Sequence, residues 1–145
     1  MTSKYLYKFV SDGLYVEGGD NSDLLDRGRL FAARFDDDMT GSWIELTPAA
    51  TGMSSHAEIC INTRLAASAV RATTMDRPEW VAANPKKAEI YCALTNNKNR
   101  GKKPNKGGDP TPVGGPNPRE ANPYGQIVRW SPDGADHESD GFRWD

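Results

Sequence analysis

Short segments of aromatic and β-branched residues, each closed by a polar turn, recur along most of this 145-residue chain. Such segments favour strands, because branched and aromatic side chains pack well on a pleated surface. One strand is predicted over 4–11, and a strand–turn–strand pattern follows over 29–46, 80–95 and 125–144. Evenly spaced antiparallel hairpins with aromatic residues are typical of propeller blades. The sequence therefore predicts a mostly β fold with about three blade-like antiparallel units of a partial β-propeller.

The overall composition agrees with a β-rich chain that has many turns. The chain is 37% apolar, contains 14 Gly and 10 Pro, and has a mean hydropathy of −0.72. These values predict a modest core in a single domain over 1–145. The net charge of −2 gives no general attraction to nucleic acid, so no nucleic-acid partner is expected.

One inserted helix is predicted at about 56–71. Ser55 followed by Glu58 forms the pattern of a capping box, in which each residue satisfies an amide at the helix start. Apolar residues then fall on one helical face. They are Ile61, Leu65, Ala66, Ala69 and Val70. His56 has no carboxylate partner in the sequence nearby, so it is expected to be exposed rather than a ligand or a base.

A long loop over 98–122 separates the second and third hairpins. It is rich in Gly and Pro, and its first part is basic. The basic residues are Lys98, Arg100, Lys102, Lys103 and Lys106. Loops of this length are usually functional or mobile. Because no aromatic residues are interleaved with the charges, a flexible, solvated loop is favoured over a nucleic-acid contact.

Two groups of candidate metal ligands are better explained by simpler roles. Asp36–Asp38 lies between two predicted strands and lacks the alternating spacing and closing glutamate of an EF-hand loop. It is therefore predicted to be a solvated hairpin tip. Cys60 and Cys92 are the only cysteines. Their spacing fits neither a disulfide framework nor a zinc site, and their apolar surroundings predict buried free thiols.

The segment Thr74–Trp80 brings opposite charges together beside a proline. Pro78 has a fixed φ and favours an extended conformation for Arg77. The planar guanidinium of Arg77 suits a phosphate or carboxylate, and the carboxylate of Glu79 suits a hard cation. The same residues would also form an ordinary surface ion pair at a helix-to-strand corner. The residues alone leave both interpretations open.

A set of short segments, spread over nearly the whole chain, carries a resemblance to one enzyme family. These segments are Tyr7–Ser11, Leu24–Gly28, Ala33–Phe35, Ile61–Ala67, Ala72–Trp80, Leu94–Asn97, Asn117–Arg119 and Asn122–Ile127. In order and approximate spacing they resemble the PhoX family of bacterial alkaline phosphatases. The block Met75–Trp80 is quite specific to that family.

The resemblance implies a six-bladed β-propeller that hydrolyses phosphate monoesters with iron and calcium ions at the propeller mouth. In the family's Arg-Pro-Glu motif, the arginine contacts the substrate phosphate and the glutamate is a metal ligand. These roles transfer to Arg77 as the catalytic residue and to Glu79 as the metal ligand. Members of the family usually leave the cytoplasm folded, so a periplasmic or extracellular location is implied.

The sequence also departs from the family's pattern. It resembles an internal to later part of the family's domain, without the export signal, the iron-binding cysteine and several carboxylate ligands of the upstream part. Neither Cys60 nor Cys92 lies in that cysteine's context, and Arg71 and Arg29 stand where glycine and threonine are expected. No membrane-spanning run is present.

Two functional hypotheses follow. In the first, the chain is part of a phosphatase whose metal site is incomplete, because one glutamate supplies few of the six to eight oxygens that calcium takes. The isolated chain is then expected to have little or no activity. In the second, it is a non-catalytic, truncated β-rich fragment or subunit, which self-associates or needs a complementing chain to cover its sheet edges.

Overall fold

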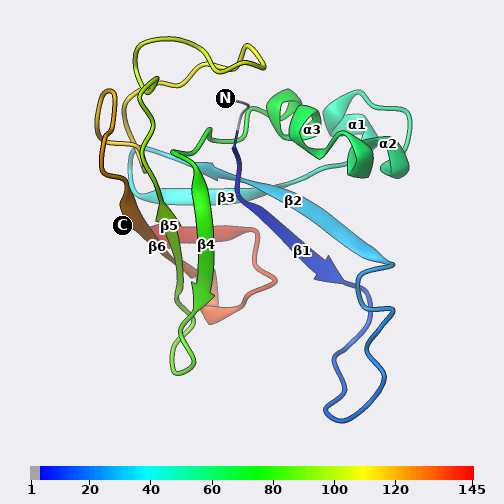
Figure 1. Ribbon diagram of the computed structural model, residues 1–145. Coiled ribbons are helices and arrows are strands. Elements are labelled where there is room, and N and C mark those ends of the chain that lie inside the picture. Colours follow the sequence, from blue (N-terminus) through cyan, green and yellow to red (C-terminus); the bar gives the residue numbers. More distant parts are fainter. Residues whose placement is uncertain (1–3) are drawn as a thin grey trace.

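The computed structural model describes residues 4–145. Over that range the chain forms one seven-stranded antiparallel sheet with the strand order β1-β2-β3-β7-β6-β5-β4 (Figure 1). The strands are β1 (Tyr7–Ser11), β2 (Gly28–Phe35), β3 (Thr40–Glu45), β4 (Pro78–Ala83), β5 (Ile90–Leu94), β6 (Gln126–Pro132) and β7 (Gly141–Trp144). The helices are α1 (Pro48–Thr51), α2 (His56–Ile61), α3 (Thr63–Ala69) and the short 3-10 turn η1 (Asp133–Ala135).

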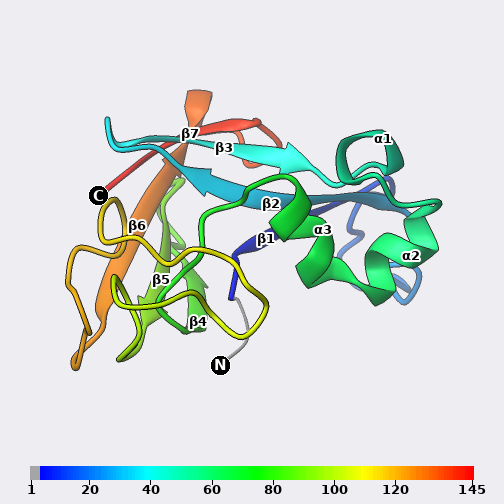
Figure 2. The ribbon, with the colours of Figure 1, turned by 90° about the horizontal axis from the view of Figure 1, so that it is seen from above.

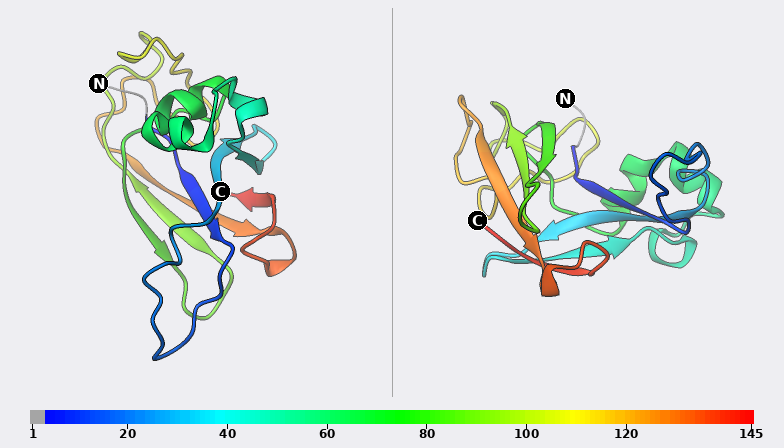
Figure 3. Two further views of the ribbon diagram at one scale, coloured as in Figure 1. Left: turned by 90° about the vertical axis from the view of Figure 1, so that its right-hand side faces the viewer. Right: turned by 90° about the horizontal axis from the view of Figure 1, so that it is seen from below.

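The sheet is curled into an open half-barrel. Seen from above and from below, β1 and β4 form its two edges, and the helices lie outside β2 and β3 (Figures 2 and 3). The amide of Met75 donates to the carbonyl of Lys4 at 2.9 Å, so the segments that precede the two edge strands meet at one end. The predicted mostly β, antiparallel fold is confirmed. The predicted hairpins join in one continuous sheet through β3 and β7, and the blade arrangement remains a prediction.

The strand β2 contributes to two cores, one on each of its faces. Phe31, Ala33 and Phe35 alternate into a cluster inside the curl. That cluster is completed by Leu6, Trp43, Met75, Cys92, Leu94, Val128, Trp130 and Phe142. Ala32 points the other way, into a cluster beneath the helices made of Tyr5, Leu46, Ile59, Ala66, Ala67 and Ala72. Two buried faces explain why β2 is continuously apolar over 30–33.

The predicted helix over 56–71 is wrong in its continuity. The chain forms α2 and α3 with a break at Asn62, whose φ of −112° and ψ of 35° lie outside the helical region. The predicted apolar face is correct for Ala66 and Val70, which pack into the cluster beneath the helices, and wrong for the other members. Ile61 and Leu65 are 82% and 53% exposed. Ile59 and Ala67, which the prediction left out, are buried together with Ala66.

The helix ends follow local sequence rules more closely. The Ser55 hydroxyl accepts from the Glu58 amide at 3.2 Å, which confirms the N-cap, although the Glu58 carboxylate accepts from Ser54 rather than Ser55. After α3, the Ala72 amide donates to the carbonyl of Ala67, and Arg71 is left-handed with φ of 56°. This is the position of a helix-ending glycine, and glycine is the residue that the family pattern leads us to expect at position 71.

The join between β3 and β7 depends on a glycine. Gly41 lies opposite both Phe35 and Phe142, and a Cβ at this position would overlap the Phe142 ring and approach the Arg34 carbonyl to 2.8 Å. The Phe142 ring is 1% exposed and packs 5.4 Å from the Trp43 ring. It therefore has little room to move.

Gly41→Ala is expected to lower the free energy of unfolding by about 1–3 kcal/mol, the usual cost of overpacking a core. Urea unfolding followed by tryptophan fluorescence measures this. Combining Gly41→Ala with Phe142→Leu should cost less than the sum of the two single changes, because the smaller side chain makes room for the Cβ. Simple additivity would show that the clash with Phe142 is not the cause.

The two cysteines differ in exposure, which corrects half of the sequence prediction. Cys92 is 0% exposed inside the curl, as predicted, whereas Cys60 is exposed. Cys60 follows Ile59, the buried residue of α2, and lies on the side of that helix that faces solvent. Burial raises the pKa of the Cys92 thiol to about 11, so this thiol stays protonated at neutral and mildly alkaline pH.

Thiol labelling at pH 8 should therefore separate the two cysteines. Cys60 is expected to react with a maleimide or disulfide reagent at the rate of a free thiol, and Cys92 only as fast as the protein unfolds. Mass spectrometry of timed samples, with and without urea, counts the labels. The Cys60→Ser variant should show no fast phase, and a fast phase in that variant would contradict the burial of Cys92.

Candidate functional site

Arg77 lies at the corner between α3 and β4, at the end of the sheet that the 98–122 loop covers (Figure 1). Its φ is 47° and its amide donates to the carbonyl of Met75 at 3.0 Å. The extended conformation predicted for this residue is therefore wrong, and the backbone is left-handed. Outside glycine this conformation costs on the order of 1–3 kcal/mol and persists only where the surroundings enforce it. Such residues cluster at functional sites.

Glu79 is brought beside Arg77 by a β-bulge. Pro78 pairs with Leu94 and Trp80 pairs with Ala93, so Glu79 is the extra residue in β4. A bulge re-aims a side chain out of the regular alternation. The Arg77 Nη2 and Glu79 Oε1 atoms are 3.5 Å apart, with side chains 34% and 45% exposed. The ion pair predicted from the sequence is thus present, and both groups can be reached from solvent.

Directly beneath Arg77 is a buried ion pair between Asp76 and Arg100. The Arg100 Nε atom lies 2.6 Å from Asp76 Oδ1, and the side chains are 1% and 0% exposed. The rest of the Arg100 guanidinium donates to the Thr74 carbonyl, the Thr74 hydroxyl and the Pro112 carbonyl at 2.9–3.3 Å. Losing one partner of such a pair costs about 3–5 kcal/mol, because the other charge is left buried alone.

Three asparagines complete the surroundings of Asp76. Asn97 donates to Asp76 Oδ1 at 2.9 Å, and Asn122 donates to Asp76 Oδ2 at 3.1 Å. Asn117 accepts from the Asp76 amide at 2.8 Å and donates to the Thr74 carbonyl at 3.0 Å. All three asparagines are buried. The carboxylate is thus hydrogen-bonded at both oxygens, which is what a buried charge requires.

Arg100 corrects the sequence-based description of the basic run. It was grouped with the solvated lysines of the 98–122 loop, but it is one of the largest fully buried side chains. The loop contacts Arg100 at two later points, because the Arg100 guanidinium donates to the Pro112 carbonyl and the Ala121 amide donates to the Arg100 carbonyl. The base of the loop is therefore fixed to the corner at Asp76. The flexibility of the rest of the loop remains a prediction.

The buried cluster was missed because its members are far apart in sequence. Asp76 lies 21, 24 and 46 residues from Asn97, Arg100 and Asn122. The available signal was the density of asparagines, at 96–97, 117 and 122, in segments already noted for their resemblance to the family. One buried aspartate with several asparagine donors far away in the sequence is a pattern that the spacing of residues along the chain does not reveal.

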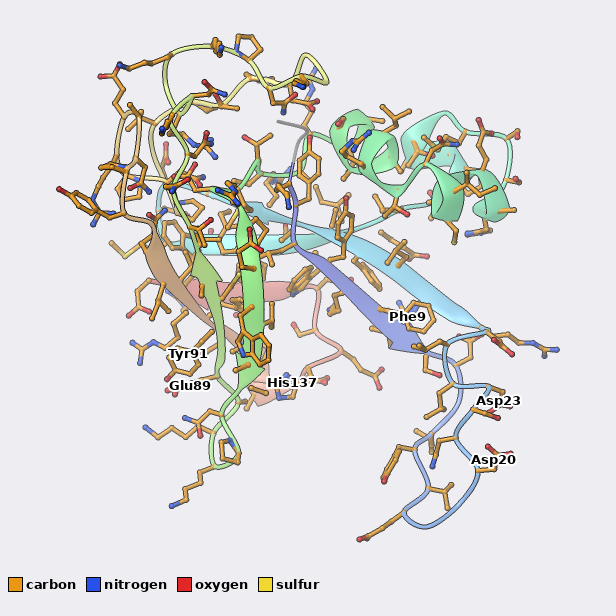
Figure 4. The ribbon with its side chains drawn as sticks, viewed as in Figure 1. Phe9, Asp20, Asp23, Glu89, Tyr91 and His137 are labelled. Carbon is orange, nitrogen blue, oxygen red and sulfur yellow. The ribbon has the colours of Figure 1, made fainter. Side chains whose placement is uncertain are left out.

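Two cavities of about 490 Å³ each lie apart from Arg77 and Glu79. One lies beneath the 98–122 loop and is lined by Arg71, Thr74, Arg100 and Asn117 among others. The other lies in the open curl, where Phe9 and His137 line it (Figure 4). Neither is lined by Arg77 or Glu79, which lie on an open rim.

No group of three or more His, Cys, Asp or Glu side chains placed to hold a metal ion occurs within residues 4–145. The hairpin tip at Asp36–Asp38 has a structural explanation. Asp38 accepts from the amide and hydroxyl of Thr40, and these hydrogen bonds lower the pKa of Asp38. His56 is exposed, as expected. In the same part of the chain, no helix is both long enough and apolar enough to cross a bilayer.

Comparison with known proteins defines the class to which this arrangement belongs. The family described as alkaline phosphatase PhoX matches residues 1–145, so the chain belongs to the PhoX alkaline phosphatase family. Among solved structures, it is similar to Pseudomonas fluorescens PhoX in complex with vanadate, a transition state analogue. The sequence identity is 46%, the TM-score is 0.86, and the match covers 99% of this chain.

The match covers only 27% of the Pseudomonas fluorescens chain, so this chain spans about a quarter of the length of that protein. A search of curated proteins found no match. The family and the shared fold of this region are therefore established.

The strain at Arg77 can be tested in the chain by itself. Arg77→Gly should raise the free energy of unfolding by about 1 kcal/mol, because glycine adopts positive φ without the steric cost of a Cβ. Arg77→Ala retains the Cβ and should give no such rise. Urea unfolding compares the two variants. Arg71→Gly, at the other left-handed arginine, is the matched control and should also stabilise.

An equal effect of glycine and alanine at position 77 would contradict the assignment of strain. The exposed ion pair with Glu79 should contribute little to the comparison, because pairs of this exposure are worth about 0–1 kcal/mol and both variants lose it.

Proposed function

We propose that this chain supplies part of the substrate site of a metal-dependent phosphate monoesterase. In this proposal Arg77 binds the phosphate and Glu79 is a metal ligand. The observation that carries it is the placement of these two side chains 3.5 Å apart on a rigid, strained corner, in a chain of the PhoX alkaline phosphatase family. The substrate class is phosphate monoesters.

The chemistry of Arg77 fits a phosphate. Its Nη1 atom donates to Asn96 Oδ1 at 3.0 Å, which fixes the plane of the guanidinium while the side chain stays one-third exposed. A fixed planar fork matches two phosphate oxygens and neutralises charge on them. Donors that are already oriented contribute most to catalysis, because no reorganisation is needed during the reaction.

The chemistry of Glu79 fits one ligand of a hard cation. Its carboxylate is 45% exposed and lies beside Arg77, so an ion held there would face the same phosphate. One carboxylate supplies at most two of the six to eight oxygens that calcium takes, so further ligands are required. Metal ions in such a site neutralise phosphate charge and activate an oxygen nucleophile. Calcium and iron are the ions proposed here, from the family resemblance.

The similar Pseudomonas fluorescens structure supports a phosphate site. Its ligand is vanadate, described as a transition state analogue, and vanadate is an oxyanion that resembles phosphate. A periplasmic or extracellular location is proposed on the family resemblance alone.

A chimera tests the proposal. This chain replaces the matching 27% of the Pseudomonas fluorescens protein, and hydrolysis of p-nitrophenyl phosphate is measured. Arg77→Ala should lower kcat/KM by about 10²- to 10³-fold, the usual loss for one oriented donor, and Arg77→Lys should recover little, because lysine lacks the fork. Glu79→Gln should lower the bound metal, measured by mass spectrometry of the purified protein, together with the activity.

Matched controls come from the same sheet. Arg34→Ala removes an exposed arginine that pairs with Asp36, and Glu89→Gln removes a carboxylate that accepts from Tyr91 at the far end of β5 (Figure 4). Both should leave kcat/KM and metal content unchanged. The proposal fails if the Arg77 and Glu79 variants behave like these controls. The 145-residue chain alone should show little or no hydrolysis.

A second role, as a subunit that associates with another chain, is favoured by β4. This edge strand pairs only with β5, and Trp80 and Val81 on its opposite faces are 72% and 53% exposed. An exposed apolar edge is a site for pairing with a further strand. Light scattering over a concentration series should then show oligomers, and Val81→Lys should return them to monomers.

A further inference from the structure

We propose that Asp76 and Arg100 are positioning residues, which hold Arg77 in its phosphate-binding orientation and couple that orientation to the 98–122 loop. This inference rests on the proposed role of Arg77. Neither residue is exposed to substrate, since their side chains are 0% and 1% exposed, so both act through Arg77.

The first step is the immobilisation of Asp76. Its carboxylate accepts from Arg100, Asn97 and Asn122, and its amide donates to Asn117. These four partners lie on three separate parts of the chain, at 97–100, 117 and 122. Asp76 therefore cannot rotate or shift without breaking several buried hydrogen bonds.

The second step transmits this order to the backbone of Arg77. The Thr95 amide donates to the carbonyl of Asp76 at 3.0 Å and to the carbonyl of Arg77 at 3.2 Å. These bonds extend the β4–β5 pairing past Pro78. The φ of 47° at Arg77 is thus supported from the Asp76 side, in addition to the hydrogen bond that the Arg77 amide donates to the Met75 carbonyl.

The third step transmits the order to the Arg77 side chain. Asn97 is held by Asp76 through its side chain and by Asn122 through its amide, which donates to the Asn122 carbonyl at 2.7 Å. The neighbouring Asn96 accepts from Arg77 Nη1 at 3.0 Å. Of these two adjacent asparagines, Asn97 is therefore hydrogen-bonded to the buried Asp76, and Asn96 is hydrogen-bonded to the exposed Arg77.

Arg100 adds the 98–122 loop to this chain of contacts. Its Nη1 atom donates to the Pro112 carbonyl at 3.2 Å, and its own carbonyl accepts from the Ala121 amide at 2.9 Å. A displacement of the loop at Pro112 or Ala121 would therefore shift Arg100, whose guanidinium neutralises Asp76. Loop position and Arg77 orientation are coupled through one side chain.

The 145-residue chain gives a structural test that needs no activity. Arg100→Lys keeps the positive charge but loses the planar guanidinium, which donates four hydrogen bonds. The variant should increase the hydrogen-exchange rate of the Thr95 amide about tenfold relative to that of the Ala33 amide in β2. Val128→Ala, which empties part of the core at a 2%-exposed position, should change both amides equally. Equal exchange changes in Arg100→Lys would overturn the positioning role.

The chimera described above gives the functional test. Asp76→Asn and Arg100→Lys should raise KM for p-nitrophenyl phosphate and the inhibition constant for vanadate about tenfold or more, because a misplaced binding group weakens both complexes. Val128→Ala should change neither KM nor the inhibition constant at a temperature where the variant is folded. Asn96→Ala is the variant of choice if Asp76→Asn does not fold, because Asn96 is exposed, and it should raise both constants in the same way.

The outcomes separate the two proposals. If Arg77→Ala has no effect on the chimera, the proposed function fails, and the exchange experiment still decides whether Asp76 and Arg100 order the corner. If Arg77→Ala is inactivating but Asp76→Asn, Arg100→Lys and Asn96→Ala behave like Val128→Ala, the positioning role is overturned and the buried pair serves stability alone.

Discussion

The ion pair between Asp76 and Arg100 is the interaction on which one whole end of this molecule depends. A charge removed from water costs several kcal/mol, and a buried pair recovers that cost only when its remaining donors and acceptors are also satisfied. Here both carboxylate oxygens and three guanidinium nitrogens have protein partners. The pair therefore requires the surrounding segments to be in place, and it holds them there in turn.

Those segments are the ones that lie beyond the ends of β4, β5 and β6. The sheet brings Pro78, Leu94 and Gln126 into one row across these three strands, so the residues beyond them necessarily gather at the same edge. Regular pairing ends there, and the exposed backbone needs other partners. Asparagine side chains supply them, because each carries both a donor and an acceptor. The buried cluster around Asp76 thus forms where the regular pairing of β4, β5 and β6 ends.

The sequence predicted those parts of the structure that depend on local patterns. Short aromatic and β-branched segments identified the strands within residues 4–145 to within a few residues, and the cap at Ser55 and the solvated tip at Asp36–Asp38 were correct. The break at Asn62 was missed because an asparagine within an apolar helical pattern costs little by propensity alone. The charged motif at 77–79 was found, but its geometry was not, because both the bulge at Glu79 and the left-handed Arg77 are set by distant residues.

The buried pair also bears on which charges remain available at the surface. The carboxylate of an aspartate next to Arg77 would ordinarily compete with a phosphate for the Arg77 guanidinium. Opposite charges on neighbouring residues attract each other strongly wherever water is excluded. Asp76 is instead fully occupied by Arg100 and the asparagines. Arg77 keeps a neutral acceptor, Asn96, and a carboxylate at 3.5 Å that is open to solvent. Arg77 therefore pairs with one solvent-exposed carboxylate rather than with two, so more of its positive charge remains available to a phosphate, as proposed. Pairing Asp76 with Arg100 keeps the acid that orders the corner and leaves Glu79 as the carboxylate beside Arg77.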